Sequence, residues 1–516
     1  MSWPNLTPLS CPAVLAGLFL FCYDSTMQES FYFYDLETSG LNSRTDRIMQ
    51  FAGQRTDLEF NPISDPVNLL VQLPEDTLPS PGAIMVTGIT PQSTKQDGLT
   101  EREFCEFVIN DMATPGTTIM GYNSVRFDDE FMRHTLWRNF YDPYEWQWKD
   151  RRSRWDLLDV VRLTRALRPE GIEWPVTDDG RSTNRLELIT KLNGISHEHA
   201  HDALADVVAL IEVSKLIKTK QPQLFDFLYS IRDKRGVQKV VNLNNPQPFV
   251  YASGRYPSAY EKTTVAFPVA AAKNGNILVF DLRYDVEELL AAEQDGTYIE
   301  KFGSHWQKEE LKKDPKKKFR IEFFPMVKTL QYNHCPAVAP LGVLEKEDGW
   351  QKISLTRAKI DENLAHLKNH PEFIERVAER ISQRPAFPPA VDPESALYNG
   401  FLDDHDRLLC SAVRNNGAED LADFHPNFAD ERLPELLLHY KAKNYPEALD
   451  QDEAAKWEAY RVERLKGQAP KFLEEIGRIQ QDLAHDKVFN GRKPEDSAYF
   501  VEELLLWYQS LQPDDY

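Results

Sequence analysis

Strand-like apolar runs alternate with amphipathic helices between residues 31 and 218, and this alternation constrains the fold more than any other feature of the sequence. Three early strands, close enough together to form a meander, are predicted over 31–34, 48–51 and 67–71. After them the pattern predicts a helix over 100–112, a strand over 117–121, a helix over 127–140 and an element of either kind over 155–163. A last helix is predicted to begin at Asp202, a good N-cap residue. Such alternation is typical of an α/β domain.

The rest of the chain divides into a β-rich region and a helical region. Short β-rich runs between 249 and 343 predict a small antiparallel domain. Four prolines between Arg384 and Pro393 indicate a stiff linker. Beyond the linker, the sequence predicts acidic helices over 433–440, 454–465, 472–483 and 499–511. We therefore expect an N-terminal extension, an α/β domain, a β-rich domain and a helical domain, with limits at 1–28, 29–221, 222–384 and 385–516.

Composition narrows the class of protein. The chain has 516 residues, enough for three domains at roughly 150 residues each. A net charge of −21 argues against a protein that simply coats nucleic acid, because such a chain would repel phosphates. The five cysteines are scattered without a C-x-x-C pair, which favours a reducing compartment, and we expect the cytoplasm.

The N-terminal extension stands apart from this pattern. Its apolar run from Ala13 to Tyr23 is too short to span a bilayer as a helix, and no basic residue precedes Arg44. Met27 stands just before the first predicted strand, so we expect an over-extended N-terminus. A weak export signal is the alternative.

Two carboxylates follow the first predicted strand. Residues i and i+2 of a strand point to the same face, so Asp35 and Glu37 would project together about 7 Å apart. Divalent cations such as Mg²⁺ prefer oxygen ligands, and the pair is therefore a candidate half of a metal site. A solvated pair on an exposed strand is the structural alternative.

Two further segments carry candidate catalytic side chains. Asp128 is predicted in the first turn of the helix that follows the strand over 117–121, where an acidic residue also suits the helix dipole. If Asp202 caps the last helix, Asp206 lies one turn in and His201 lies in the preceding loop. A histidine with an ordinary pKa of about 6.5 is suited to take a proton from water at neutral pH.

These patterns, in this order, resemble the DEDDh family of 3′→5′ exonucleases, and among them bacterial exonuclease I. The similarity to exonuclease I begins near residue 29 and runs to the end of the chain. The segments that carry it are 35–40, 121–130, 138–144, 153–160, 166–171, 200–206, 397–401 and 441–446. The resemblance implies an RNase-H-like α/β exonuclease domain, then an SH3-like β-rich domain and an α-helical C-terminal domain.

The resemblance also implies an activity, a cofactor and a partner. The family digests single-stranded DNA processively from the 3′ end and releases 5′-mononucleotides, in DNA repair and recombination. The resemblance implies that four carboxylates hold two Mg²⁺ ions, which Mn²⁺ can replace. It also implies that His201 is the general base and that Glu37 contacts the substrate as well as the metal. The implied metal ligands are Asp35, Glu37, Asp128 and Asp206. The implied partner is the acidic C-terminal tail of single-stranded-DNA-binding protein. We expect a monomer without membrane association.

Aromatic and basic side chains are interleaved between residues 133 and 168. Aromatic faces stack on unpaired bases, and guanidinium groups neutralise phosphates, although part of these aromatic residues must belong to the core. In the family, the strand-contacting positions correspond to Arg133, Tyr144, Trp148, Arg162 and Arg168. Arg185 is predicted to contact phosphate because Asn184 and Glu187 form an N-x-x-E capping pattern that puts it in the first turn of a helix.

Two other functions remain open. A DEDDh exoribonuclease would differ in its contacts near the terminal 2′ position, which the sequence does not identify. A non-catalytic scaffold that binds single-stranded DNA would be expected to have lost at least one of the five chemical residues, all of which are present.

Overall fold

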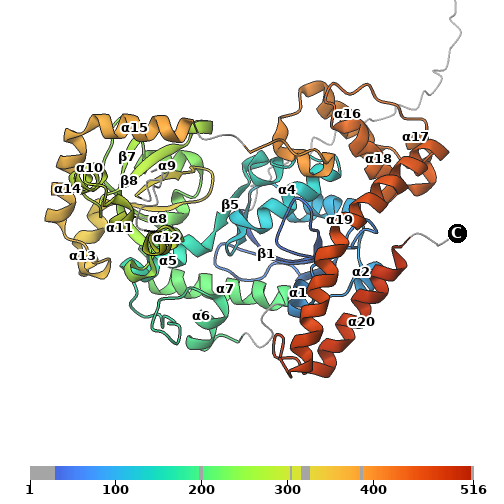
Figure 1. Cartoon of the computed structure of the whole chain (residues 1–516), viewed down its shortest axis with the longest axis horizontal. Coiled ribbons are helices and arrows are strands. Elements are labelled where there is room, and N and C mark those ends of the chain that lie inside the picture. Colours follow the sequence, from blue (N-terminus) through green and yellow to red (C-terminus); the bar gives the residue numbers. More distant parts are fainter. Residues whose placement is uncertain (1–28, 197–201, 303–304, 315–325, 384–386, 513–516) are drawn as a thin grey trace, which may run out of the picture.

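The computed structural model describes residues 29–196, 202–302, 305–314, 326–383 and 387–512. The N-terminal extension, whose start the sequence questions, lies outside the described residues. Figure 1 shows three lobes, with the α/β domain in the middle, the β-rich domain on its left and the helical domain on its right. The α/β, β-rich and helical character predicted for the three regions is confirmed by the order of the elements.

The α/β domain is built on a five-stranded sheet in the order β3-β2-β1-β4-β5. The first three strands form the predicted antiparallel meander, and β4 and β5 extend the sheet parallel to β1. Strand β1 is therefore central and carries side chains into the middle of the domain. The strands are β1 (Ser30–Thr38), β2 (Ile48–Thr56), β3 (Val67–Leu70), β4 (Thr117–Gly121) and β5 (Ser153–Asp156).

Helices cover this sheet, and the longest of them, α7, packs against β1 and β2. The ambiguous segment over 155–163 is both kinds of element: the strand ends at Asp156, whose carboxylate accepts a hydrogen bond from the Leu158 N–H (2.9 Å) and so caps the next helix. The helices are α1 (Pro81–Thr87), α2 (Pro91–Asp97), α3 (Glu101–Phe107), α4 (Asp128–Arg138), α5 (Leu157–Leu167), α6 (Leu186–Leu192), α7 (Ala203–Lys220), α8 (Pro222–Ser230) and α9 (Lys234–Val240).

The β-rich domain contains an antiparallel five-stranded sheet in the order β10-β6-β7-β8-β9. Its buried side chains continue the core of the α/β domain without a break, so the two domains are packed together. The strands are β6 (Phe249–Ala252), β7 (Thr263–Ala271), β8 (Ile277–Asp281), β9 (Val327–Leu330) and β10 (Ala337–Pro340). The helices are α10 (Val286–Gln294), α11 (Tyr298–Phe302), α12 (His305–Lys313), α13 (Gly349–Lys352), α14 (Arg357–Asn369) and α15 (Pro371–Ser382).

The helical domain corrects one prediction. The helices predicted over 454–465 and 472–483 are one continuous helix, α19, with Pro470 inside it. Proline removes one backbone hydrogen bond of the helix. The buried residues Leu465, before Pro470, and Phe472 and Ile476, after it, belong to one apolar cluster with α1 and α20, and this packing keeps the helix continuous. The helices are α16 (Asp404–Asn415), α17 (Ala418–Ala422), α18 (Leu433–Asn444), α19 (Gln451–Ala484) and α20 (Pro494–Ser510). None of the described helices has both the length and the apolar character needed to cross a bilayer.

Candidate active site

Strand β1 presents Asp35 and Glu37 side by side. They pair in register with Ala52 and Gln50 of β2, and both are only partly buried. Tyr34 and Leu36, which alternate with them, are buried on the opposite face of the sheet. The prediction that the two carboxylates share one face of a strand is therefore confirmed.

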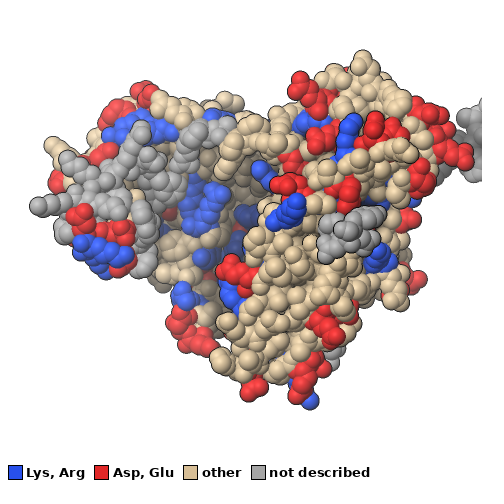
Figure 2. Space-filling model, turned by 45° about the vertical axis from the view of Figure 1, so that its right-hand side comes forward, with Lys and Arg blue, Asp and Glu red and all other residues tan. Residues whose placement is uncertain are grey.

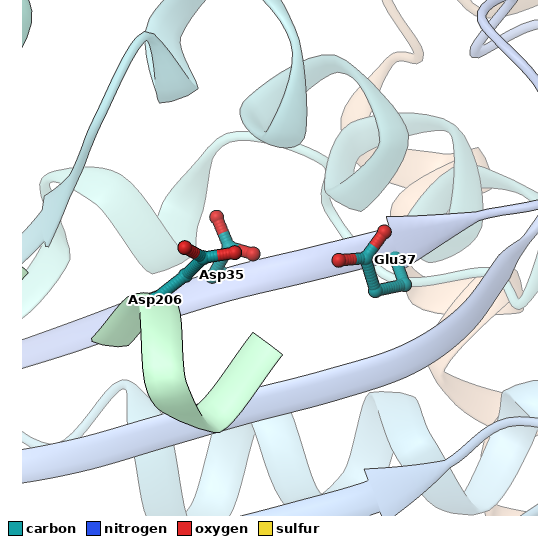
Figure 3. A group of neighbouring side chains, drawn as sticks. All are labelled: Asp35, Glu37 and Asp206. Atoms are coloured by element: carbon teal, nitrogen blue, oxygen red, sulfur yellow. The ribbon is translucent and has the colours of Figure 1, made fainter. Parts of the chain in front are cut away.

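Helix α7 brings a third carboxylate to this face. Asp202 caps the helix by accepting the Ala205 N–H (3.1 Å), as predicted, and Asp206 lies one turn further in. Because α7 crosses β1, Asp206 reaches the strand, and Figure 3 shows its carboxylate beside that of Asp35. Ligand oxygens of Asp35, Glu37 and Asp206 all lie within 4.8 Å of one another, which makes them a candidate metal-binding group among the described residues.

Asp128 approaches the same strand from the start of α4. Its carboxylate accepts a hydrogen bond from the backbone N–H of Leu36, between the two β1 carboxylates. Asp128 lies outside the 4.8 Å group, but its charge acts directly on Asp35. The four predicted carboxylates are therefore neighbours, with three of them close enough to share one ion.

Asp156, which sequence reasoning did not single out, holds the loop that delivers Asp128. It accepts hydrogen bonds from the backbone N–H groups of Asn123 (2.9 Å) and Val125 (3.3 Å) as well as from the Leu158 N–H in the first turn of α5. The turn out of β4 needs Gly121, because a Cβ there would stand 2.4 Å from the Ser124 Cβ. The sequence could have indicated this role, because Asp156 ends the strand over 153–156 and is followed directly by a helix.

Like charges and burial perturb these carboxyl groups strongly. Burial, followed by the charge of Asp128, raises the pKa of Asp35 well above its usual value. Burial and Asp206 raise the pKa of Glu37 to about 8, and burial and Asp129 raise that of Asp128 to about 8. The protein on its own therefore cannot ionise all four groups at neutral pH. Divalent cations bound to carboxylate oxygens remove this repulsion, and the ligand set is the hard oxygen set that Mg²⁺ and Mn²⁺ prefer.

This electrostatic repulsion predicts that the stability of the metal-free protein falls as pH rises. Glu37 holds its proton more tightly in the folded chain (pKa about 8) than in the unfolded chain (4.5), so raising the pH between these values favours unfolding. In EDTA we expect the melting temperature to drop by at least about 3 °C between pH 5 and pH 8. Added Mg²⁺ should restore it more at pH 8 than at pH 5, because the cation needs ionised ligands. Calorimetry on the parent and on Glu37→Gln, which should flatten the profile, tests this; an equal Mg²⁺ effect at both pH values would contradict it.

Comparison with protein families assigns all three parts of the chain. Residues 32–214 match the family described as Exonuclease, 232–383 the Exonuclease I SH3-like domain, and 391–510 the Exonuclease I C-terminal domain. The chain is 39% identical over 452 residues to Exodeoxyribonuclease I of Haemophilus influenzae, covering 87% of this chain and 93% of the relative. The chain belongs to the exonuclease I family. Exodeoxyribonuclease I of Escherichia coli is 38% identical over 470 residues, which cover 90% of this chain and 96% of the relative.

Solved structures of exonuclease I have the same fold. E. coli Exonuclease I in complex with a dA16 oligonucleotide superposes with a TM-score of 0.84 at 35% identity, covering 94% of this chain and 100% of that chain. A moderately thermophilic Exonuclease I from Methylocaldum szegediense gives a TM-score of 0.81 at 38% identity, covering 94% and 99%. The predicted fold class, an α/β exonuclease domain followed by an SH3-like and a helical domain, is confirmed.

The general base that the exonuclease I resemblance implies, His201, lies outside the described residues. The described chain resumes at Asp202, the cap of α7, whose charge also reaches Glu37. The assignment of His201 therefore stays a prediction.

Three of the residues predicted to contact DNA, Arg133, Tyr144 and Trp148, lie in α4 or in the segment after it. Trp148 is 62% exposed, whereas Trp137, Phe140, Trp146 and Trp155 are buried. Arg133 is buried, pairs with Glu130 (2.5 Å) and lies over the ring of Tyr144 (5.5 Å). The structure thus separates the core aromatic residues from Trp148, which the sequence could not do.

The other predicted contacts lie apart from these. Arg162 pairs with Asp159 (2.5 Å), and Arg168 pairs with Glu347 (3.2 Å) of the SH3-like domain. Arg185 is exposed, but its predicted setting is wrong: α6 begins at Leu186, and Arg185 itself is the N-cap residue, without a capping side chain. Segment 183–185 stays extended because its carbonyl groups accept hydrogen bonds from Arg165 and from the Tyr122 hydroxyl.

The SH3-like domain adds a basic cluster that sequence reasoning missed. The Lys328 ammonium lies 3.5 Å from the centre of the Tyr256 ring and donates a hydrogen bond to the Arg255 carbonyl (2.9 Å). Burial, with Arg255 and Lys262 adding to it, lowers the pKa of Lys328 to about 8. Burial and the charge of Arg162, in the nuclease domain, lower the pKa of Lys262. Figure 2 shows Lys and Arg side chains gathered in the hollow between two lobes. Arg255, Lys262 and Lys328 are separated in sequence, so no local pattern predicted that they would lie together.

Proposed function

We propose that this chain hydrolyses single-stranded DNA from its 3′ end, in a processive, Mg²⁺-dependent reaction that releases 5′-mononucleotides. The observation that carries the proposal is the convergence of Asp35, Glu37 and Asp206 within 4.8 Å, with Asp128 beside them, in a chain of the exonuclease I family. These carboxylates come from three segments far apart in sequence.

The carboxylates are proposed to act as the metal ligands. Asp35, Glu37 and Asp206 would hold one Mg²⁺, and Asp35 with Asp128 would face a second. When bound, two such ions lower the pKa of the attacking water and stabilise the leaving 3′ oxygen. His201 would take the proton of that water, because it immediately precedes the cap of α7 and Asp206 follows one turn later. Glu37 would also contact the terminal nucleotide.

The strand is proposed to reach this site over exposed aromatic and basic side chains. The exposed Trp148 offers a surface on which a base can stack, and the ring of Tyr144, with Arg133 over it, offers a second aromatic group. Arg162, Arg168 and Arg185 would neutralise phosphates, and Arg255, Lys262 and Lys328 would extend this basic surface onto the SH3-like domain. A strand held by two domains at once dissociates more slowly than it is shortened, which is the physical condition for processivity.

Several further properties remain proposals that follow from the family. They are a role in DNA repair and recombination, a cytoplasmic location, a monomeric state, and binding of the acidic tail of single-stranded-DNA-binding protein. The domain limits at 29–221, 222–384 and 385–516 also stay a prediction.

Degradation of end-labelled oligonucleotides tests the proposal. A 5′-labelled single-stranded DNA should shorten stepwise with Mg²⁺, a 3′-labelled one should release its label at once as a mononucleotide, and EDTA should stop both. Duplex DNA should be a poor substrate. Faster loss of an RNA of the same sequence would favour the exoribonuclease, and binding without degradation in Mg²⁺ and in Mn²⁺ would favour the scaffold.

A further inference from the structure

The SH3-like domain touches the nuclease domain at the edge strand β5, close to the acidic site. Arg154 of β5 donates a hydrogen bond through one guanidinium nitrogen to the carbonyl of Asn333, in the loop between β9 and β10. In return, the Cys335 thiol of that loop donates to the Arg154 carbonyl (3.3 Å). Cys335 is buried and has a φ of 47°, a left-handed conformation that only a well-fixed loop maintains. The loop is therefore held to β5 by reciprocal bonds.

The other guanidinium nitrogen of Arg154 points toward the active site. It forms an ion pair with Asp129, which is 1% exposed and also accepts a hydrogen bond from the Tyr34 hydroxyl (2.7 Å). Tyr34 is the residue before Asp35 on β1, and Asp129 is the residue after Asp128 on α4. The backbone neighbours of two proposed metal ligands are thus joined through one buried carboxylate.

The start of α4 depends on these bonds for its position. Phe127, the N-cap residue, has irregular backbone angles (φ −131°, ψ −79°), and its side chain forms no capping hydrogen bond. A helix end without a cap is free to shift unless tertiary contacts hold it. Asp129 supplies such contacts through Arg154 and Tyr34, and Asp128, the residue before it, bonds to the Leu36 N–H from the same turn.

We infer that Arg154 is a positioning residue through which the SH3-like domain sets the place of Asp128 in the active site. The inference rests on the proposed role of Asp128 as a metal ligand. Docking of the SH3-like loop on β5 orients Arg154, Arg154 fixes Asp129, and Asp129 fixes the turn that carries Asp128. The second domain thus contributes to catalysis as well as to holding the strand.

The substitution Arg154→Lys tests the inference because lysine keeps the positive charge but replaces the rigid fork, whose separate nitrogens bond to Asp129 and Asn333, by a single nitrogen. We expect kcat on a single-stranded oligonucleotide to fall by about 10- to 100-fold, with KM changed less than about threefold. The affinity for Mn²⁺ without DNA, measured by electron paramagnetic resonance, should fall by about tenfold. Tyr34→Phe, which removes one bond to Asp129 and should fold normally, is expected to give a smaller loss of the same kind.

Arg165→Lys is the matched control. Arg165 is also a buried arginine of the nuclease domain that pairs with the SH3-like region, through Glu261 (2.7 Å), but its other hydrogen bonds go to the carbonyl groups of Pro175 and Thr183. We expect a similar change in melting temperature with kcat and Mn²⁺ affinity retained. Equal losses of kcat in both variants would reduce Arg154 to a structural role, and an unchanged kcat in Arg154→Lys would overturn the inference. Asp128→Asn is measured alongside: if it keeps its activity, the proposed metal site fails as well.

Discussion

Replacing Asp206 by Asn is expected to lower the turnover number by at least about 10³-fold while leaving affinity for a single-stranded oligonucleotide nearly unchanged. Each tenfold loss corresponds to about 1.4 kcal/mol of transition-state stabilisation, and a bound ion supplies several kcal/mol of it. Asp206 shares the 4.8 Å group with Asp35 and Glu37, so an amide there leaves the first ion with one charged ligand fewer. Single-turnover rates and fluorescence anisotropy in EDTA measure the two quantities separately.

The same substitution is expected to stabilise the metal-free protein. Asp206 is the largest charge acting on Glu37 after burial and also raises the pKa of Asp35, so its removal relieves repulsion. A variant that is inactive yet melts at a higher temperature in EDTA identifies a group retained for chemistry rather than for folding. Glu212→Gln, further along α7, is the control and should keep parental turnover. Near-parental turnover of Asp206→Asn would contradict the assignment.

The parts of this site that the sequence could predict are those fixed by local geometry. Asp35 and Glu37 share a strand face because strands have a period of two residues, and Asp206 lies one turn after a recognisable cap. Both relations depend only on the local backbone conformation and not on how the rest of the chain folds. That these two segments meet depends on α7 crossing β1, which only the family resemblance supplied in advance.

The parts that escaped prediction depend on partners distant in sequence. Asp129 was part of a recognised motif, but its ion pair with Arg154 joins two elements, and the bond to Asn333 comes from another domain. Arg185 was misplaced because a capping pattern fitted locally while carbonyl contacts from elsewhere kept the preceding residues extended. Pro470 marked a break that the packing of α19 overrides.

Charges are arranged in opposite ways at two places in the described chain. In the active site, carboxylates face one another and their pKa values are raised. At the contact between the nuclease and helical domains, Glu394 forms an ion pair with Arg47 (2.5 Å), bonds to His439 (3.1 Å) and pairs with Lys443. Burial alone would raise the pKa of Glu394, but Lys443 and Arg47 hold it well below its usual range. The first cluster requires cations from solution, whereas the second contains its own.

Replacing Glu394 by Ala is therefore expected to destabilise the helical domain by about 3–5 kcal/mol, because it leaves buried cations without their main partner. Glu394 is 1% exposed, and its partners come from the loop before β2 and from α18. Native-state hydrogen exchange of the α18 amides should show the loss as an acceleration of about 10²- to 10⁴-fold. Because the pKa of Glu394 is lower in the folded than in the unfolded chain, its contribution is present above about pH 4.5 and lost as pH falls.

Two variants separate this effect from simple loss of charge. Glu394→Gln should cost less than the Ala variant, because the amide oxygen of glutamine can still accept hydrogen bonds from Arg47 and Lys443. Glu474→Ala breaks the pair with Arg478 on α19, whose side chains are 69% and 65% exposed, and should change stability by less than about 0.5 kcal/mol. If Glu394→Ala costs no more than the loss of this surface pair, the other contacts between the two domains hold the helical domain without it, among them the Lys443–Asp76 pair and the apolar cluster shared with α1. The acid-side loss of stability would then come from Asp76, which is buried at the same contact and pairs with Lys443 (3.0 Å), Arg464 (3.5 Å) and Arg47 (3.8 Å). Despite that burial, Lys443 and Arg464 hold the pKa of Asp76 below its usual value, so its protonation also costs stability as pH falls.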